Sequence, residues 1–395
     1  MAIHLLLKKS FKPADLISTH SALYLFSRTL ASEVPSYNFE CSFKPLSPEE
    51  ISPKSDYEIA GRKWLPGSMG KGFPKYLNKP KEGFPYALEV TPGQNYNLGE
   101  WAYIVRRLID DNLSKYGTML LRGLPLEDSK EISNFSTALG YKAMSYPRGG
   151  GADRSLQDAD AQVYTASEEP PEFTIELHNE LGYLPTYPRK LIFYCLQEPA
   201  EGCGGFTVIC DSKEFVSRLD PKLIKKLDEK QIRYYHSLPD ESKSTYVSWQ
   251  QAFKTKDIEE VKAYLEKGGY GYSFDEKKGI VTFWNTLPAF MPHPDTGEKI
   301  WFNSVHITHH TGLKESPMYP GEDKLDTVYS WDSTYGDGSP IKLDVIQHIR
   351  ACMWHSTYGF QWKTGDMLVV DNMSALHGRL SFTGKRKILA FLMAE

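Results

Sequence analysis

The chain has little cysteine, no long apolar segment and no surplus of positive charge. Its 395 residues include 5 cysteines, none of them in a Cys-x-x-Cys pair. An odd number of dispersed thiols favours a reducing compartment, so we expect an intracellular, cytoplasmic protein. No apolar run approaches the ~18 residues of a membrane span. The formal net charge of −4 gives no reason to expect nucleic acid or an anionic membrane as a partner.

The N-terminal segment also lacks the apolar length of a secretory signal peptide. Residues 1–9 are basic, and no acidic residue occurs before Asp15. These features leave organelle targeting open as an alternative to an ordinary amphipathic first helix.

Composition and the positions of proline and glycine divide the chain into an accessory part and a core. Hydrophobic residues make up 41% and aromatic residues 13%, which suits a globular protein with a β-rich core and a lined pocket. Residues 1–95 are broken by prolines and by a glycine-rich loop at 67–74. We therefore expect 1–95 to be an accessory region packed on a core domain of residues 96–395.

The core domain shows short strand patterns interrupted by helical ones. Helical periodicity is found at 98–115, 128–139, 212–230, 247–267 and 341–353. Strand patterns are found at 116–123, 189–196, 206–210, 271–274, 280–284, 299–305, 367–371 and 386–392. Because there is no regular βαβ alternation, we predict a mainly β, α+β fold. The prediction is a jelly-roll pair of sheets with helical decoration and a mostly helical insert, or lid, at about 212–270.

The stretch 174–180 carries the first candidate for chemistry, His178 followed by Glu180. On a strand, side chains two residues apart point to the same face. One imidazole and one carboxylate form two-thirds of the 2-His-1-carboxylate triad that binds non-haem Fe(II). A second such pair, His293 and Asp295, lies among prolines and a glycine, so we interpret it as a turn between strands.

His377 is the candidate for the third ligand, since it follows the buried strand pattern 367–371. Arg386 opens the final strand, and an arginine near such an iron can hold a carboxylate with two parallel hydrogen bonds. Thr207 could add a hydroxyl to the same carboxylate. Each residue alone has an ordinary interpretation, as a core histidine, a surface ion pair or a strand former. Their order along the chain is much more specific.

These residues resemble the TauD/TfdA-type Fe(II)/2-oxoglutarate-dependent dioxygenases, in particular the clavaminate synthase-like branch. The resemblance runs from about residue 98 to 395, and its matching segments are 119–124, 164–171, 187–195, 301–303, 335–338, 365–366, 371–372 and 377–379. It implies a double-stranded β-helix core with His178, Glu180 and His377 as iron ligands. It also implies that Arg386 and Thr207 hold the distal carboxylate of 2-oxoglutarate.

The sequence departs from the family pattern at Ala390, where many relatives carry a second arginine. We therefore expect the iron-side carboxylate of 2-oxoglutarate to be held differently, with help from Arg379. The resemblance implies that 2-oxoglutarate and O2 react at Fe(II), giving succinate, CO2 and an oxidant that abstracts a substrate hydrogen. Hydroxylation, desaturation and ring closure can all follow. Related halogenases lack the carboxylate ligand, so Glu180 predicts no native halogenation.

The resemblance and the loop positions also suggest residues that contact the substrate, namely Arg148, Trp301, Asn303, His306 and Asp337. Close histidines such as His306, His309 and His310 can bind zinc, but no cysteine is near them, and we interpret them as a polar loop at the mouth of the site.

The predicted function is oxidation of a small polar metabolite, amino-acid-like or amine-derived. An oxidative cyclase or desaturase and a non-catalytic β-helix binding protein are the alternatives. The sequence leaves the oligomeric state open.

Overall fold

The computed structural model describes residues 42–146, 156–158, 162–167, 169–244, 247–317 and 329–394. Contacts divide the chain after Ser42, and the compact unit discussed below is Phe43–Glu395. The predicted substrate contact Arg148 and the basic segment 1–9 lie outside the described residues. Within the described ranges, no helix has the length and apolar character needed to cross a membrane.

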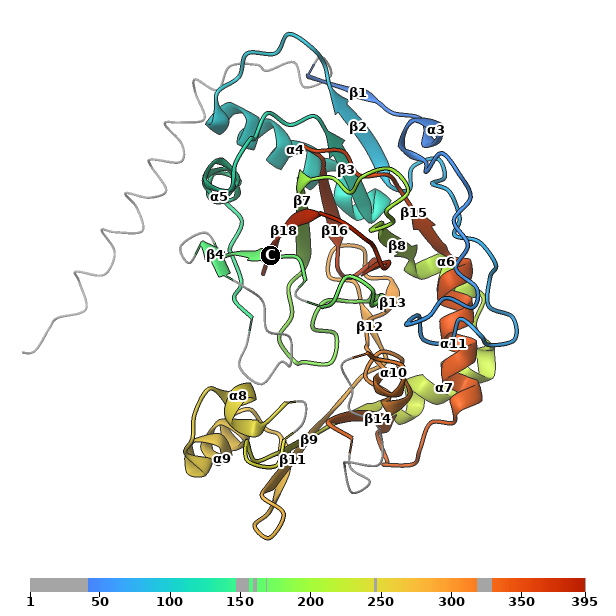
Figure 1. The fold of residues 1–395 in the computed structure, drawn as a ribbon, viewed down its shortest axis with the longest axis vertical. Helices are drawn as coiled ribbons and strands as arrows, with labels where there is room; N and C mark the ends of the chain where they lie inside the picture. Colours follow the sequence, from blue (N-terminus) through green and yellow to red (C-terminus); the bar gives the residue numbers. More distant parts are fainter. Residues whose placement is uncertain are drawn as a thin grey trace, which may run out of the picture. The chain divides into compact units, whose positions relative to one another are not determined.

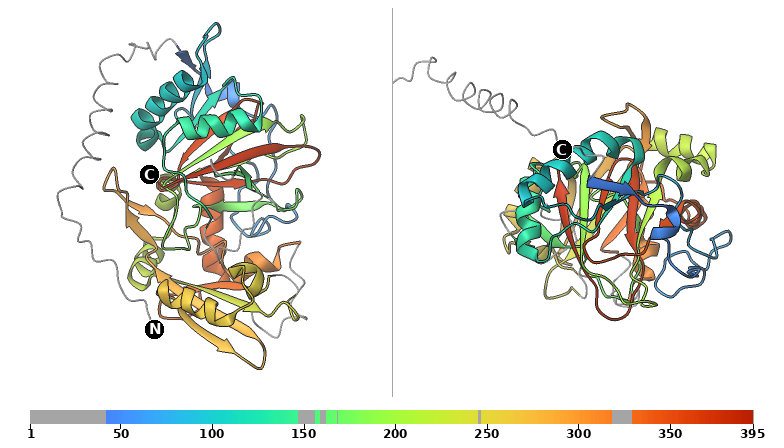
Figure 2. Two further views of the ribbon diagram at one scale, coloured as in Figure 1. Left: turned by 90° about the vertical axis from the view of Figure 1, so that its left-hand side faces the viewer. Right: turned by 90° about the horizontal axis from the view of Figure 1, so that it is seen from above.

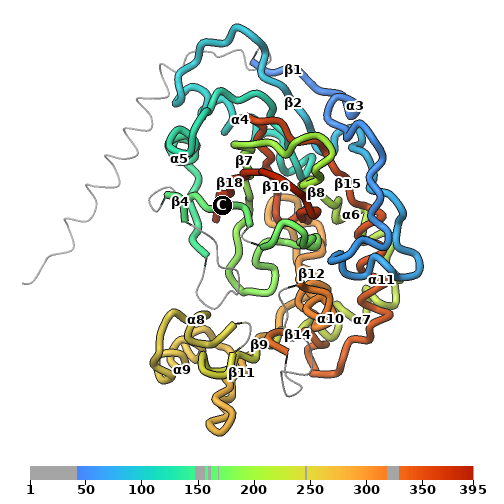
Figure 3. Tube along the Cα trace, viewed as in Figure 1, coloured from blue at the N-terminus to red at the C-terminus, as the bar shows by residue number. Residues whose placement is uncertain are grey.

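Two sheets form the centre of this unit (Figure 1). In the described residues the larger sheet has eight strands, in the order β1 (Phe43–Pro45), β2 (Tyr86–Val90), β3 (Thr118–Arg122), β16 (Met367–Asp371), β7 (Lys190–Gln197), β18 (Lys387–Met393), β5 (Val163–Thr165) and β4 (Leu156–Asp158). The smaller sheet has four, in the order β15 (Thr357–Gly359), β8 (Thr207–Asp211), β17 (Ala375–Arg379) and β6 (Ile175–His178). Figure 3 shows how β16 and β18, from the end of the chain, lie beside β7.

The hydrophobic core between the sheets explains their arrangement. Leu368 and Val370 of β16 pack in one cluster with Ile209 of β8 and Ala375 of β17. A fully buried aliphatic side chain of this kind contributes about 1.5–3 kcal/mol to the free energy of unfolding. The predicted mainly β jelly-roll core with helical decoration is confirmed.

Helices cover the outer faces of both sheets, as Figures 1 and 2 show. On the larger sheet α4 (Leu98–Tyr116) packs on β3 and β16, and α5 (Ser129–Ala138) packs on α4. The Asn97 side chain accepts a hydrogen bond from the Glu100 amide and caps α4, as its sequence position predicted. The short helix α3 (Pro48–Ile51) follows β1.

The smaller sheet is covered by α6 (Ser212–Ser217), α7 (Pro221–Lys230) and α11 (Leu343–His355). The prediction of one helix over 212–230 is wrong, because the helix breaks before Pro221. Proline lacks the amide hydrogen that a helix interior needs, and Asp220 instead caps a new helix by accepting a hydrogen bond from the Lys222 amide.

A third sheet lies in the following part of the chain, in the order β10 (Gly271–Asp275), β11 (Ile280–Leu287), β9 (Ile232–Pro239) and β14 (Trp331–Tyr335). The same part of the chain also contains the helices α8 (Trp249–Phe253), α9 (Ile258–Lys267) and α10 (His310–Lys314). It contains in addition the hairpin of β12 (Phe290–Pro292) and β13 (Lys299–Trp301). The predicted insert at 212–270 thus contains helices and also β9, which sequence analysis missed. The alternation of buried Ile232, Tyr234 and Leu238 was the available signal.

The accessory role expected for residues 1–95 and the lid role of the insert stay predictions. The described part of the accessory region contributes β1 and β2 to the larger sheet, where β2 pairs in parallel with β3.

Candidate metal centre

Two histidines face each other across the smaller sheet. His377 of β17 lies directly opposite His178 of β6, and their ring centroids are 4.3 Å apart. The close approach of these strands depends on Gly378, because a Cβ atom there would lie 2.7 Å from the carbonyl oxygen of Ile175. Strand pairing therefore brings together two imidazoles that are distant in sequence.

Glu180 completes the group from outside the strand. β6 ends at His178, and the chain turns through Leu181, whose φ is +56°. Glu180 Oε2 lies 3.6 Å from His178 Nε2 and 3.4 Å from His377 Nε2. The expected alternation along a strand does not reach Glu180, so a turn rather than a strand aims this carboxylate.

The donor set suits Fe(II). The Nδ1 atom of His178 lies 2.8 Å from the carbonyl oxygen of Glu176, which can only accept, so Nδ1 carries the hydrogen and Nε2 carries the lone pair. That lone pair points into a group whose ligand atoms, from His178, Glu180 and His377, all lie within 4.8 Å of one another. Two imidazoles and one carboxylate form the facial triad of non-haem Fe(II) sites. The residues present therefore fit the metal that the sequence predicted.

A buried ion pair holds the strand that carries His178. Arg350 of α11 donates to both carboxylate oxygens of Glu176, at 2.6 and 2.9 Å, and its Nη2 also donates to the carbonyl of His306 at 3.0 Å. Burial raises the pKa of Glu176, and the charge of Arg350 opposes that rise. Sequence analysis missed this pair, although an acidic residue in an apolar strand two residues before His178 was a usable signal.

Arg386 and its neighbours form a second charged group near the histidines. Arg386 Nη2 donates to Thr207 Oγ1 at 3.0 Å, and Trp362 Nε1 donates to the same oxygen at 3.1 Å. The Nε atom of Arg386 is buried, and among the described residues it has no hydrogen-bond partner. Burial and the neighbouring charge of Arg379 lower the pKa of Arg386 to about 9. A half-buried guanidinium with a buried, unpaired Nε atom is suited to a carboxylate ligand.

One pocket joins the histidines to the arginines. It is lined by Ala166, Ser167, Ile175, His178, Phe193, Thr207, His377, Gly378, Arg379 and Arg386. Gly205 packs against the Arg386 side chain, since a Cβ atom there would lie 3.1 Å from Arg386 Cδ. Ala390 is 2% exposed and packs in the core between the sheets, so it supplies no polar group here.

Arg379 lines this pocket but also has structural partners. Its two terminal nitrogens donate to Ser167 Oγ and to the carbonyls of Glu169, Pro170 and Phe173, at 2.7–3.0 Å. These bonds hold the loop that leads into β6. The expectation that Arg379 helps to hold the iron-side carboxylate of 2-oxoglutarate stays a prediction.

Three of the predicted substrate contacts lie elsewhere and have structural roles. The Trp301 ring packs edge-on against Phe215 and Phe290 in the core. The Asn303 side chain donates to the carbonyl of Ala289 and accepts from the amide of Val305. Asp337 pairs with Lys230 in an exposed turn. None of the three lines the pocket around His178, and their contact with substrate stays a prediction.

His306 is hydrogen-bonded to β6, the strand that carries His178. Its Nε2 donates to the carbonyl of Leu177 at 2.6 Å, so it supports β6. Burial, with a smaller effect of the Arg350 charge, lowers the pKa of His306 to about 3. Its role as a substrate contact stays a prediction.

His309, His310 and Asp332 form a second close group of metal-ligand types. Both nitrogens of His309 are engaged, because Nε2 donates to the carbonyl of Ile341 at 3.2 Å and Nδ1 accepts from the Thr311 amide. His310 Nδ1 lies 3.0 Å from Asp332 Oδ1. Because His309 has no free lone pair for a metal ion, we interpret these three residues as part of the hydrogen-bond network of their loop.

The second His-x-acid pair lies in the turn between β12 and β13, as predicted. His293 Nδ1 accepts from the amide of Asp295, and its Nε2 donates to Asp371 Oδ2 at 2.9 Å. The hydrogen bond to Asp371 raises the pKa of His293, and burial opposes that rise. Both nitrogens are engaged away from the three ligands.

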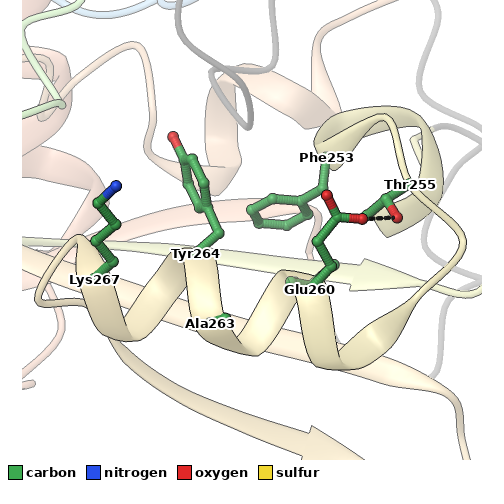
Figure 4. A pocket seen from close by; sticks show the side chains of 7 residues that line it. Phe253, Thr255, Glu260, Ala263, Tyr264 and Lys267 are labelled. Atoms are coloured by element: carbon green, nitrogen blue, oxygen red, sulfur yellow. Dashed lines mark hydrogen bonds between the residues drawn. The ribbon is translucent and has the colours of Figure 1, made fainter. Parts of the chain in front are cut away.

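A separate hollow occurs on the insert, at α9 and the end of α8 (Figure 4). Figure 4 shows Glu260 accepting a hydrogen bond from Thr255 beside the Phe253 ring. The hollow contains none of the candidate ligands, and we assign it no function.

The comparisons with known proteins agree with this geometry. A family model described as "Taurine catabolism dioxygenase TauD, TfdA family" matches residues 84–392. The chain belongs to this family. The resemblance found in the sequence is confirmed, and the TauD/TfdA enzyme described here is a dioxygenase that uses Fe(II), 2-oxoglutarate and O2 on a small molecule.

Individual relatives cover most of the TauD/TfdA chain. The dapdiamide synthesis protein DdaC of Enterobacter agglomerans is 31% identical over 293 residues, 72% of this chain and 84% of DdaC. A clavaminate synthase-like protein of Arabidopsis thaliana is 27% identical over 328 residues, 82% of this chain and 94% of the relative. The solved structure of PvcB, titled an Fe, alpha-ketoglutarate dependent oxygenase from an isonitrile synthetic pathway, has a TM-score of 0.44 and 16% identity. It covers 80% of this chain and 87% of PvcB.

The first prediction concerns the metal ligands of the TauD/TfdA enzyme. His178→Ala or His377→Ala should abolish Fe(II) binding and turnover, because the two remaining ligands cannot hold a facial site firmly. His293→Ala is the matched control and should keep the metal, because Asp371 retains its hydrogen bonds from Met373 and Ser374. Metal titration under anaerobic conditions measures both. Retention of iron by the His178 variant together with its loss from the His293 variant would refute the assignment.

The second prediction concerns the cosubstrate. Arg386→Lys keeps the charge but loses the planar fork, so the KM for 2-oxoglutarate should rise about 10- to 100-fold, the effect of a lost hydrogen bond to a charged group. Iron affinity should be unchanged. Arg107→Lys, at an exposed arginine 4.0 Å from Asp111, serves as the control. An unchanged KM would show that another residue, with Arg379 as the first candidate, binds the distal carboxylate.

Proposed function

We propose that His178, Glu180 and His377 bind Fe(II), and that Arg386 with Thr207 binds the distal carboxylate of 2-oxoglutarate. On this proposal the enzyme oxidises a C–H bond of a small polar, amino-acid-like or amine-derived metabolite. The observation that carries the proposal is the pocket in which a two-histidine, one-carboxylate group lies beside Arg386, a half-buried arginine whose buried Nε atom has no hydrogen-bond partner among the described residues.

The charges of the pocket support this pairing of ligands. Glu180 supplies one negative charge near the histidines, and Arg386 and Arg379 each supply one positive charge to the lining of the pocket. Fe(II) would be paired with the Glu180 carboxylate, and the carboxylate of 2-oxoglutarate would be paired with Arg386. Pairing each buried charge with an opposite one limits the desolvation penalty.

The residues of the chain act mainly by positioning. The hydrogen bond from His178 Nδ1 to the Glu176 carbonyl keeps Nε2 free to bind the metal. Thr207 receives hydrogen bonds from Trp362 and Arg386, which fixes the guanidinium orientation before the carboxylate binds. When bound, Fe(II) supplies the centre at which O2 and 2-oxoglutarate react to give succinate, CO2 and the oxidised substrate.

The proposed substrate class draws on the sequence and on one relative. DdaC is named as a dapdiamide synthesis protein, and the word diamide points to a nitrogen-containing compound. A nitrogen-containing metabolite therefore agrees with the amine-derived class inferred from the sequence. Desaturation or ring closure at the same site is the second candidate outcome. A cytoplasmic location and the absence of a nucleic-acid or membrane partner stay predictions from composition.

The insert at 212–270 is proposed to be a lid that excludes water from the pocket. It has hydrophobic contacts of its own, since α8 and α9 pack with β9 and β11 through residues such as Trp249, Val261 and Phe283. The α8–α9 part of the insert, which has this small core, can move separately from α6 and α7, which pack on the smaller sheet.

The third prediction tests the lid. Substrate added to the Fe(II)/2-oxoglutarate complex without O2 should slow amide hydrogen exchange in or beside residues 212–270. Metal and 2-oxoglutarate alone are the control. Exchange that stays insensitive to substrate throughout residues 212–310 would count against a lid.

The fourth prediction tests the reaction. Protein loaded anaerobically with Fe(II) and 2-oxoglutarate, then exposed to O2 with amino acids and small amines, should release succinate with one substrate group. A product heavier by one oxygen indicates hydroxylation, and one lighter by two hydrogens indicates desaturation or ring closure. The His178→Ala protein provides the background.

Excess chloride or bromide in the same assay should give no halogenated product, because the Glu180 carboxylate takes the ligand place that a halide would need. A halogenated main product would mean that Glu180 does not bind the metal.

A further inference from the structure

The side chain of Asn372 is hydrogen-bonded to the backbone of Glu180. Its Oδ1 accepts from the Glu180 amide at 2.7 Å, and its Nδ2 donates to the Glu180 carbonyl at 3.0 Å. Nδ2 donates its second hydrogen to the carbonyl of Pro188 at 2.7 Å. The side chain is completely buried, and both of its amide hydrogens are used. Asn372 thus pairs with Glu180 as a neighbouring strand would.

Glu180 needs such a partner because it lies beyond the end of β6. His178 and His377 are fixed by the pairing of β6 with β17, whereas Glu180 belongs to none of the strands that the structure describes. Asn372 comes five residues before His377, in the turn between β16 and β17. The bonds of Asn372 therefore set the position of the carboxylate ligand relative to the hairpin that carries His377.

The turn that carries Asn372 is itself held on both sides. The backbone amide of Asn372 donates to the carbonyl of Arg189 at 3.0 Å, and its carbonyl accepts from Asn179 Nδ2 at 2.7 Å. The preceding Asp371 accepts from the Met373 amide and from the Ser374 hydroxyl, within the turn itself. Because its turn is anchored, the Asn372 side chain can hold the Glu180 backbone in a fixed position.

We propose that Asn372 is a positioning residue for the metal centre, which sets the place of the Glu180 carboxylate through the Glu180 backbone. The proposal rests on the proposed assignment of His178, Glu180 and His377 as ligands. Asn372 itself contributes no ligand atom. It allows a carboxylate from a loop to meet two imidazoles from paired strands.

The fifth prediction tests this role with Asn372→Leu, which keeps the approximate size and removes all three side-chain hydrogen bonds. Zn(II) is the probe metal, because imidazoles retain it when the carboxylate is absent. Competition with a chromophoric chelator measures its affinity, and a His178→Ala/His377→Ala protein gives the off-site background. Affinity should fall about 10- to 100-fold, the usual effect of losing an outer-shell partner. Asn372→Asp, which keeps the acceptor for the Glu180 amide, is the second variant should Leu fail to fold.

The decisive comparison repeats the substitution in a Glu180→Ala protein. The hydrogen bonds of Asn372 go to the backbone of residue 180, so they persist there, and Asn372→Leu should lower the melting temperature equally in both backgrounds. The loss of Zn(II) affinity should shrink to within about twofold in the Glu180→Ala background, because no carboxylate remains to be positioned. Asn78→Leu removes two donor bonds to carbonyls far from the ligands and should leave Zn(II) affinity unchanged.

The outcomes separate this proposal from the assignment of the ligands. Wild-type binding no stronger than the off-site background would overturn the metal site itself. Wild-type binding above background with an unchanged affinity in Asn372→Leu would overturn only the role of Asn372. An equal affinity loss in both backgrounds would also overturn it, since that result means a general disturbance of the fold.

Discussion

The pairing of β6 with β17 is the interaction on which the site depends. It places His178 and His377 directly opposite each other, at a ring separation of 4.3 Å. Only glycine at position 378 permits the strands to approach so closely, since a Cβ atom there would meet the Ile175 carbonyl. The sheet therefore does more than support the site, because its backbone spacing sets the distance between the two histidines proposed as metal ligands.

Buried hydrogen bonds and ion pairs fix the parts of the site that strand pairing does not fix. Arg350 and Glu176 fix β6 from the side of α11, and Asn372 fixes the turn with Glu180. Buried polar groups of this kind are costly when a partner is missing, so each arrangement tolerates few alternatives. The hydrophobic clusters hold the sheets together, whereas these directional bonds decide where the ligand atoms lie.

The pocket combines groups of opposite charge. A carboxylate lies beside the two histidines, and Arg386 and Arg379 line the same pocket as those histidines. Burial lowers the pKa of Arg386, so the guanidinium there is less stable than in water until an anion joins it. On the proposed assignment, a metal cation would offset the charge of Glu180, and the carboxylate of 2-oxoglutarate would offset the charge of Arg386.

The sequence by itself determined the fold class, the family and the identity of the ligand candidates. His178, Glu180, His377, Thr207 and Arg386 were all selected from residue type, order and resemblance, and the structure gathers them around one pocket. Local periodicity also predicted α4 with its Asn97 cap, because helix signals lie within a few neighbouring residues. The break before Pro221 and the strand β9 were readable from the same local signals but were missed.

Tertiary structure alone decided how these residues are held. Nothing near Asn372 in the sequence indicates that it pairs with Glu180, because the two residues are 192 positions apart and only the sheets bring them together. The same reason hides the pairing of Arg350 with Glu176, and it explains why Trp301 and Asn303 lie in structural contacts away from the pocket. Residue type fixes which chemistry is available, while the distances and partners that select it arise from contacts between remote segments.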